Sequence, residues 1–183
     1  MSGPRGGGVA ECDGVADQED IVEGTFGKAY CLVGRYIAGR SVLVDYVRSF
    51  EPGFIFTTAL LPMVTAGALA SVRHLKTSEL ERAGQRERVA ETRAALTAAG
   101  FPPMPGESDI LPILIGDAGR CQAISDRLTA RHGIYVTANN HPTAPVGGER
   151  LRLAPLHLHG DCHLAALIAA LTKTSKAIGQ PCG

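Results

Sequence analysis

The sequence has no excess of charge of either sign. Its 18 Lys and Arg residues balance its 18 Asp and Glu residues. Proteins that bind nucleic acid or anionic membranes usually carry a basic excess. The composition therefore argues against nucleic acid and membranes as partners.

Long apolar runs are missing as well. No stretch approaches the roughly 20 apolar residues that a membrane-spanning helix needs. The opening residues, MSGPRGGGVAECDG, contain neither the apolar core of a secretory signal nor the pattern of a transit peptide. The five cysteines are scattered without CxxC spacing, which favours free thiols over a disulfide framework. Together these features predict a cytoplasmic protein.

Hydrophobic patterning predicts alternating strands and helices in the first hundred residues. We expect strands at 20–23, 30–38 and 53–58, the second of them apolar enough to be buried on both faces. We expect helices at 40–50, 62–75 and 78–100. The last of these has a capping box, Ser78 with Glu81, and a stop at Gly100. This order is typical of an α/β layer.

A turn-rich segment at 101–108, FPPMPGES, predicts a domain boundary. Beyond this segment the hydrophobic pattern predicts strands at 110–115, 134–136 and 150–153. It predicts helices at 118–131 and 162–173, and Gly133 ends the helix at 118–131. We therefore expect two domains, residues 1–100 and residues 101–183. The second is a smaller α+β unit.

The turn Thr25-Phe26-Gly27-Lys28 is the first candidate for chemistry. A lysine between two buried strands is unusual, because an ammonium group prefers water. Desolvation would lower its pKa and make it a nucleophile that can form an imine with an aldehyde cofactor. The Thr25 hydroxyl could then bind the cofactor phosphate. The alternative is a loop lysine that simply reaches water, since short motifs often match by chance.

Three longer segments carry a more specific signal: GPRGGGVAECDGVADQEDIVEGTFGKAY, FIFTTALLPMVTAGALASVRHLKTS and RHGIYVTANNHPTAPVGGERLRLAP. Together they closely resemble 5-aminolevulinate synthases, a branch of the α-oxoamine synthase family of fold-type I pyridoxal-phosphate enzymes. The resemblance runs from Gly3 to about Leu171. It implies an α/β fold: a partial PLP-transferase large domain of the aspartate-aminotransferase type, followed by a small α+β carboxy-terminal domain.

The resemblance assigns cofactor-binding roles to four positions. Lys28 matches the catalytic lysine, which holds pyridoxal 5'-phosphate as a Schiff base and moves the α-proton of glycine. Thr25 matches a phosphate-binding threonine. Thr57 and Thr58, in FIFTT, match a phosphate-binding segment that serves the neighbouring protomer's cofactor. This last assignment implies that the full-length enzyme is a homodimer.

The resemblance also assigns substrate-binding roles. Thr143, in HPTAP, and Arg152, in ERLRLAP, match positions that handle a substrate carboxylate. Arginine suits this role because its planar fork can bind both carboxylate oxygens. The alternative for Arg152 is a surface ion pair, since most charged residues are solvated.

The implied reaction is the condensation of glycine with succinyl-CoA, which releases coenzyme A and carbon dioxide and yields 5-aminolevulinate for tetrapyrrole synthesis. Two alternatives stay open. One is another α-oxoamine synthase, such as those making 8-amino-7-oxononanoate or 2-amino-3-oxobutyrate. The other is a non-catalytic remnant.

The sequence departs from the family pattern at several points. It lacks the D-E-x-H motif, whose aspartate binds the cofactor's ring nitrogen, so we expect little product from these residues alone. Cys31 and Arg35 stand where the family has glycine. If either position needs a positive φ, the side chain there costs stability.

The segment from His157 to His163 holds three histidines, one cysteine and one aspartate. Such groups can bind a transition metal. They lack a fixed ligand spacing, however, which is the specific sign of a metal site. We therefore expect an ordinary junction between a loop and a helix, with no metal.

Overall fold

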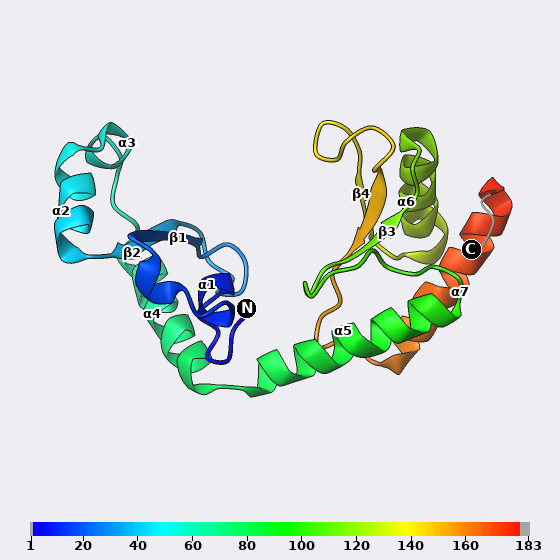
Figure 1. The fold of residues 1–183 in the computed structure, drawn as a ribbon, viewed down its shortest axis with the longest axis horizontal. Coiled ribbons are helices and arrows are strands. Elements are labelled where there is room, and N and C mark those ends of the chain that lie inside the picture. The colour runs from blue at the N-terminus through cyan, green and yellow to red at the C-terminus, as the bar shows by residue number, and fades with distance from the viewer. Residues whose placement is uncertain (1, 180–183) are drawn as a thin grey trace. The chain divides into compact units, whose positions relative to one another are not determined.

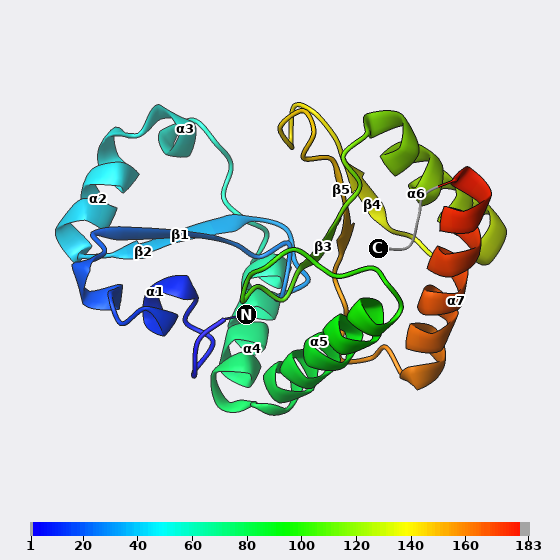
Figure 2. The ribbon, with the colours of Figure 1, turned by 45° about the vertical axis from the view of Figure 1, so that its right-hand side comes forward.

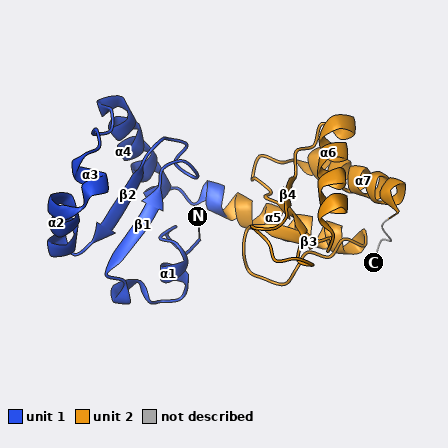
Figure 3. Ribbon diagram, turned by 90° about the horizontal axis from the view of Figure 1, so that it is seen from above, with its two compact units in different colours: residues 1–82 blue, residues 83–183 orange. Residues whose placement is uncertain are grey.

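The computed structural model describes residues 2–179 and divides the chain into two compact units. Unit 1 comprises Met1–Arg82 and unit 2 comprises Ala83–Gly183 (Figure 3). The division lies within helix α5 (Leu80–Ala98), earlier than the boundary at 100/101 that the sequence predicts. The reason is packing, because Leu96 of α5 belongs to the hydrophobic core of unit 2 and Val89 packs against that core.

Unit 1 is built around an antiparallel hairpin of β1 (Ile21–Thr25) and β2 (Arg35–Gly39). The two strands pair in register from Ile21 with Gly39 to Thr25 with Arg35. The remaining elements of the unit are α1 (Val9–Cys12), η1 (Ala16–Gln18), α2 (Ser41–Phe50), α3 (Pro52–Ile55) and α4 (Pro62–Thr77), and Figure 1 labels the four α-helices. The helices expected at 40–50 and 62–75 are confirmed.

The strand expected at 30–38 forms only in its second half. Cys31 and Gly34 have positive φ angles of 55° and 107°, which strand residues do not adopt. The Cys31 N–H also donates to the Lys28 carbonyl at 2.9 Å, so the chain turns here. The expected burial on both faces is wrong too, because β2 pairs only with β1 among the described residues and most of its side chains are exposed.

The strand expected at 53–58 is wrong. Residues Pro52–Ile55 form the short helix α3. Pro52 occupies the first turn, where its fixed φ and missing N–H suit a helix. The side chain of Glu51 caps this turn by accepting the Gly53 N–H at 3.3 Å. These local signals outweigh the apolar run that indicated a strand.

Unit 1 buries few apolar side chains. In its described part, residues 2–82, Ala68 is the only apolar side chain that is fully buried. Large apolar side chains are instead exposed, including Tyr46 at 63%, Met63 at 74% and Phe56 at 87%. The faces of α2, α3 and α4 therefore leave extensive apolar surface uncovered within this unit.

Unit 2 is an antiparallel sheet with strand order β3-β5-β4, formed by β3 (Leu111–Leu114), β4 (Thr137–Asn139) and β5 (Arg150–Leu153). The strands expected at 110–115 and 150–153 are confirmed. The strand expected at 134–136 forms three residues later, at β4. Helices α5, α6 (Ala118–His132) and α7 (Asp161–Ile178) pack with the sheet in one hydrophobic core (Figure 2).

The core of the protein lies in unit 2, between one face of the sheet and its helices. Along β5, Leu151 and Leu153 are buried while Arg152 is exposed, the alternation of a sheet with one covered face. The inward side chains of the strands meet Ile124 and Leu128 of α6, Leu171 of α7 and Leu96 of α5. This core holds Arg152 on the outer face of the sheet.

Helix boundaries in unit 2 follow their capping residues. The Asp117 side chain accepts the Arg120 N–H at 2.7 Å and starts α6. Gly133, with φ 64°, ends α6 as expected. Helix α7 runs further than the expected 162–173, to Ile178, and ends at Gly179 with φ 74°. No helix within residues 2–179 is both long enough and apolar enough to cross a membrane.

A hydrogen-bonded corner joins α4 to α5. The Ser78 hydroxyl donates to the Glu81 carboxylate, and His74 Nε2 lies 2.7 Å from the same group. Ser78 and Glu81, the residues of the expected capping box, thus bond to each other directly through their side chains. The hydrogen bond from Ser78 and, to a smaller extent, the one from His74 lower the pKa of Glu81 from its usual 4.5 to about 2.

We predict that this corner is sensitive to acid. Because the folded pKa of Glu81 is depressed, its stabilising contribution is present above 4.5 and is lost as the pH falls towards 2. Glu81→Gln should therefore lower the denaturant midpoint near neutral pH and flatten its dependence on pH below 4.5. Glu19→Gln, at an exposed position in the same unit, serves as the control. Equal acid profiles for Glu81→Gln and the unsubstituted chain would contradict the assignment.

Candidate active site

The turn that carries Lys28 joins β1 to β2 and is closed by backbone hydrogen bonds. The Phe26 N–H donates to the Gly34 carbonyl at 2.9 Å, and the Leu32 N–H donates to the Phe26 carbonyl at 2.8 Å. Inside this frame, Thr25 Oγ1 accepts the Gly27 N–H at 3.1 Å and donates to the Gly34 carbonyl at 3.4 Å. The frame fixes the backbone on both sides of Lys28.

Aromatic rings support the base of the turn. The ring centroids of Phe26 and Tyr36 lie 5.0 Å apart, and those of Phe26 and Tyr30 lie 5.5 Å apart. Ser71 of α4 donates to the Tyr30 carbonyl at 3.2 Å and ties the turn to that helix. Burial, followed by the neighbouring Tyr36, raises the pKa of Tyr30 above its usual value. Sequence reasoning did not single out these aromatic residues.

The Lys28 side chain is exposed and makes no hydrogen bond or ion pair within residues 2–179. This differs from the expectation of a lysine desolvated between buried strands, because β2 begins only at Arg35. A free primary amine on a fixed turn is nonetheless the group that an aldehyde cofactor requires. The residues present therefore fit such a cofactor through Lys28 and the adjacent Thr25 hydroxyl.

Thr57 and Thr58 lie between α3 and α4, also in unit 1. Both side chains are exposed, and neither hydroxyl forms a hydrogen bond within the described residues. No hydrogen bond links either hydroxyl to the Lys28 turn within the described residues. Their hydroxyls are available to a group from outside this unit.

The two expected substrate-binding residues lie in unit 2. Arg152 stands on the outer face of β5, in register with Pro112 of β3 and Thr137 of β4. It forms no ion pair within residues 2–179, so the alternative of a surface ion pair is not realised there. Thr143 lies in the loop after β4, and its hydroxyl donates to the Asn140 carbonyl at 2.7 Å. Arg152 lines a cavity of unit 2, whereas Thr143 does not.

Glu149 is a buried acidic residue that sequence reasoning missed. It is only 4% exposed, and its Oε2 has no hydrogen-bond partner in the described structure. Its carbonyl accepts the Ile115 and Gly116 N–H groups at 2.8 and 3.0 Å, which ties the 140–149 loop to the end of β3. The alternation along β5 could have predicted its burial, since Glu149 lies two residues before Leu151 and four before Leu153, which are both buried.

Cys31 and Arg35, which stand where the family resemblance places glycine, differ in backbone conformation. Cys31 has a φ of 55°, in the left-handed region, where a side chain costs about 1–2 kcal/mol. Arg35 lies in β2 without a positive φ, and its guanidinium pairs with Glu23 at 3.1 Å. Only Cys31 therefore occupies a backbone conformation that favours glycine.

We predict that Cys31→Gly stabilises the turn by about 1 kcal/mol, because glycine adopts this φ without a clash. Arg35→Gly is the matched control and should destabilise by roughly 0.5–1 kcal/mol, since glycine weakens a strand. Denaturant unfolding followed by tyrosine fluorescence measures both, as the sequence has no tryptophan. A lower midpoint for Cys31→Gly would contradict the strain at this position.

The histidine-rich segment forms the junction between β5 and α7. His159 and His163 lie near each other, with ring centroids 5.9 Å apart. Within residues 2–179, no group of three or more His, Cys, Asp or Glu side chains is arranged to hold a metal ion.

Comparisons with known proteins place the chain among pyridoxal-phosphate enzymes. A 5-aminolevulinate synthase of Rhizobium meliloti (strain 1021) is 49% identical over 171 residues, which cover 93% of this chain and 42% of the relative. A serine palmitoyltransferase structure from Sphingomonas wittichii matches with a TM-score of 0.89 and 26% identity, covering 98% of this chain and 45% of that one. The chain thus spans less than half the length of these relatives.

A second solved structure, of SPT with a PLP internal aldimine, matches with a TM-score of 0.84 and 28% identity over 98% of this chain and 45% of that one. These findings support pyridoxal phosphate as the cofactor, and the sequence is 5-aminolevulinate synthase-like. The family model for aminotransferase class I and II matches residues 3–170. The chain therefore belongs to the aminotransferase class I and II family.

Proposed function

We propose that this chain supplies the lysine-bearing part of a pyridoxal-phosphate-dependent acyltransferase. The reaction condenses glycine with succinyl-CoA and gives 5-aminolevulinate, coenzyme A and carbon dioxide. The observation that carries this proposal is the 49% identity to a 5-aminolevulinate synthase over 93% of the chain. The closed turn that presents the free Lys28 amine supports it independently.

Lys28 and Thr25 are the residues of unit 1 that would hold the cofactor. When bound, pyridoxal phosphate supplies an electron sink for the carbanion derived from glycine. The Lys28 Nζ would hold the cofactor covalently before glycine arrives and then remove a proton from the glycine α-carbon. The Thr25 hydroxyl would exchange its long 3.4 Å bond to the Gly34 carbonyl for a phosphate oxygen.

Arg152 and Thr143 are the residues of unit 2 that would handle a substrate carboxylate. The guanidinium of Arg152 has no competing partner within the described residues and can bind both carboxylate oxygens. The buried leucines on either side of it hold β5 in place, so the arginine is positioned by the core. Thr143 would add a hydroxyl from the neighbouring loop.

We also propose that the enzyme is a homodimer in which Thr57 and Thr58 bind the phosphate of the partner's cofactor. The exposure of both threonines, beside the exposed Phe56, supports a role at a surface that another chain covers. We assign the enzyme to the cytoplasm, which the free thiols of Cys12, Cys31, Cys121 and Cys162 support.

A hybrid enzyme tests the proposed function. It joins the part of the Rhizobium meliloti relative that lies upstream of the match, in frame, to this chain. We expect the purified hybrid to make 5-aminolevulinate from glycine and succinyl-CoA when pyridoxal phosphate is supplied, and the 183-residue chain alone to make little. A soluble, cofactor-loaded hybrid that accepts only other acyl-CoA substrates would indicate a different α-oxoamine synthase. A soluble, cofactor-loaded hybrid that accepts no acyl-CoA substrate would indicate a non-catalytic remnant.

Subunit mixing tests the dimer. Lys28→Ala and Thr57→Ala hybrids should each be impaired, but a mixed dimer would contain one site with both residues intact. Co-expression of the two should therefore restore part of the turnover. No recovery, with mixed dimers demonstrated by affinity tags, would show that Thr57 does not serve the partner's cofactor.

A further inference from the structure

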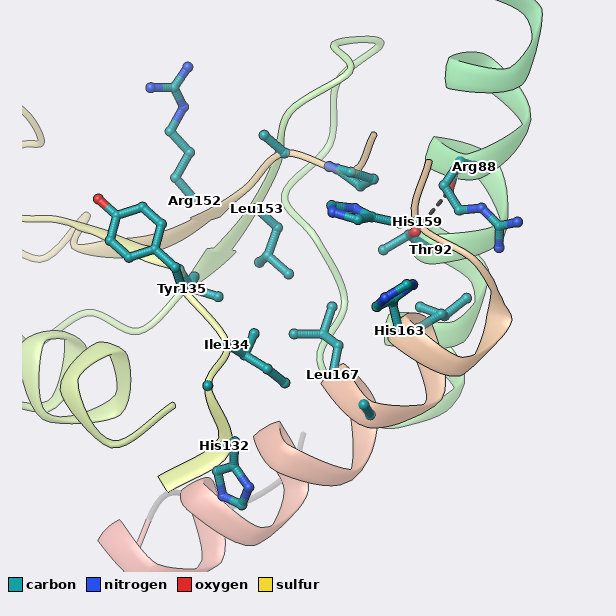
Figure 4. A pocket seen from close by; sticks show the side chains of 16 residues that line it. Arg88, Thr92, His132, Ile134, Tyr135, Arg152, Leu153, His159, His163 and Leu167 are labelled. Atoms are coloured by element: carbon teal, nitrogen blue, oxygen red, sulfur yellow. Dashed lines mark hydrogen bonds between the residues drawn. The ribbon is translucent and has the colours of Figure 1, made fainter. Parts of the chain in front are cut away.

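A cavity of about 480 Å³ lies within unit 2. Figure 4 shows His159 and His163 near each other on one side of the view, with the lining side chains of Ile134, Leu153 and Leu167 in its middle. Arg152 and Tyr135 lie on the other side of the view. The proposed roles of Lys28 and Arg152 leave the two histidines unused.

Backbone hydrogen bonds fix the tautomer of both histidines. The Leu156 N–H donates to His159 Nδ1 at 3.1 Å, and the Gly160 N–H donates to His163 Nδ1 at 3.0 Å. Each Nδ1 is therefore an acceptor, so the proton of the neutral ring must sit on Nε2. Each neutral ring therefore has an Nε2–H donor and no free lone pair.

This tautomer selects the kind of ligand. A metal ion would need the Nε2 lone pair, and supplying it would move the proton to Nδ1 and break the bond from the backbone. An anion, by contrast, accepts from both Nε2–H groups without disturbing either bond. No acidic side chain lines the cavity to oppose it. Arg88, beside the histidines, already pairs with Asp161 and Glu91 at 2.9 and 2.8 Å.

We propose that this cavity binds a small organic anion with an apolar body. The anionic group accepts hydrogen bonds from His159 Nε2 and His163 Nε2. The apolar body lies over the side chains of Ile134, Leu153 and Leu167, which are partly or fully buried. The volume is ample for a medium-chain carboxylate.

Octanoate is the probe for this site, with octylammonium as the cation of matched length, titrated into the 183-residue chain labelled with ¹⁵N. Long-range ¹H–¹⁵N spectra report the histidine tautomers directly. We expect the Nε2–H form at His159 and His163, and shifts of both on addition of octanoate. Nδ1–H tautomers, absence of shifts, or equal affinity for octylammonium would each overturn the proposal.

The variants use asparagine, whose side-chain oxygen can replace Nδ1 as the backbone acceptor while Nε2 is lost. Together, His159→Asn and His163→Asn should weaken octanoate binding by at least about ten-fold, since hydrogen bonds to a charged group are individually strong. His157→Asn, in the same segment but outside the cavity lining, should bind octanoate as the unsubstituted chain does. Unchanged affinity in the double variant would overturn the proposal.

Discussion

Replacing Lys28 with alanine is expected to reduce 5-aminolevulinate formation by the hybrid enzyme at least about 10³-fold. Two roles are lost together, because Lys28 Nζ is both the group that would bind the cofactor covalently and the base that would move the glycine proton. Proton transfer by a positioned side chain alone contributes roughly 10²–10⁴-fold. Product formation at saturating substrates measures the loss.

Two further variants separate chemistry from charge. Lys28→Arg keeps a cation on the turn but offers no primary amine, so it should be as inactive as Lys28→Ala. Lys76→Ala removes an exposed lysine from α4 and should leave turnover unchanged. Turnover in Lys28→Ala close to that of the parent hybrid would show that another amine performs the reaction.

The second large effect is expected at Arg152. Arg152→Ala should weaken the binding of glycine by roughly 10- to 100-fold, because a charged hydrogen-bonded pair contributes about 1.5–3 kcal/mol. Cofactor binding should persist, since Lys28 and Thr25 belong to the other unit. Spectroscopic titration of the cofactor-loaded hybrid with glycine measures the affinity separately from turnover.

Arg150 provides the matched control on the same strand. It lies two residues before Arg152 in β5 and therefore on the same face of the sheet. Its guanidinium, however, contacts Met104 Sδ at 3.8 Å, and the residue is half-buried. Arg150→Ala should therefore leave glycine affinity largely unchanged, because the Arg150 guanidinium contacts Met104 and is not expected to bind the substrate carboxylate. If both variants weaken glycine equally, the effect comes from the strand and not from the Arg152 guanidinium.

The helices of unit 2 could be predicted because local groups determine their ends. Asp117 caps α6 through its carboxylate, and Gly133 ends it in the left-handed conformation that glycine adopts readily. The alternation from Arg150 to Leu153 likewise predicts a strand with one covered face. In each case the residues that specify the structure are neighbours in the sequence.

Unit 1 was harder to predict, because an apolar run is compatible with more than one structure. The segment at 53–58 was expected to be a strand, yet Pro52 and Glu51 begin a helix there. The segment at 30–38 was expected to be buried, but this depends on neighbouring layers, which its own sequence does not specify. Tertiary context decides such segments more than local propensity does.

The candidate site was predicted in part. The Thr25–Lys28 turn was recognised from its motif, and the structure places it on a closed frame between β1 and β2. The exposure of Lys28 and the positive φ of Cys31 depend on where β2 begins. The His159 and His163 tautomers depend on which backbone N–H meets each ring, and residue spacing does not reveal that.

Peptide mapping tests the central claim most directly. The hybrid enzyme is loaded with pyridoxal phosphate, treated with borohydride to make its covalent bond to the protein permanent, and digested for mass spectrometry. We predict that the cofactor mass is found on the peptide containing Lys28, and that Lys28→Ala carries no such label. A label at another lysine, or none in a cofactor-loaded enzyme that forms product, would contradict the assignment of Lys28.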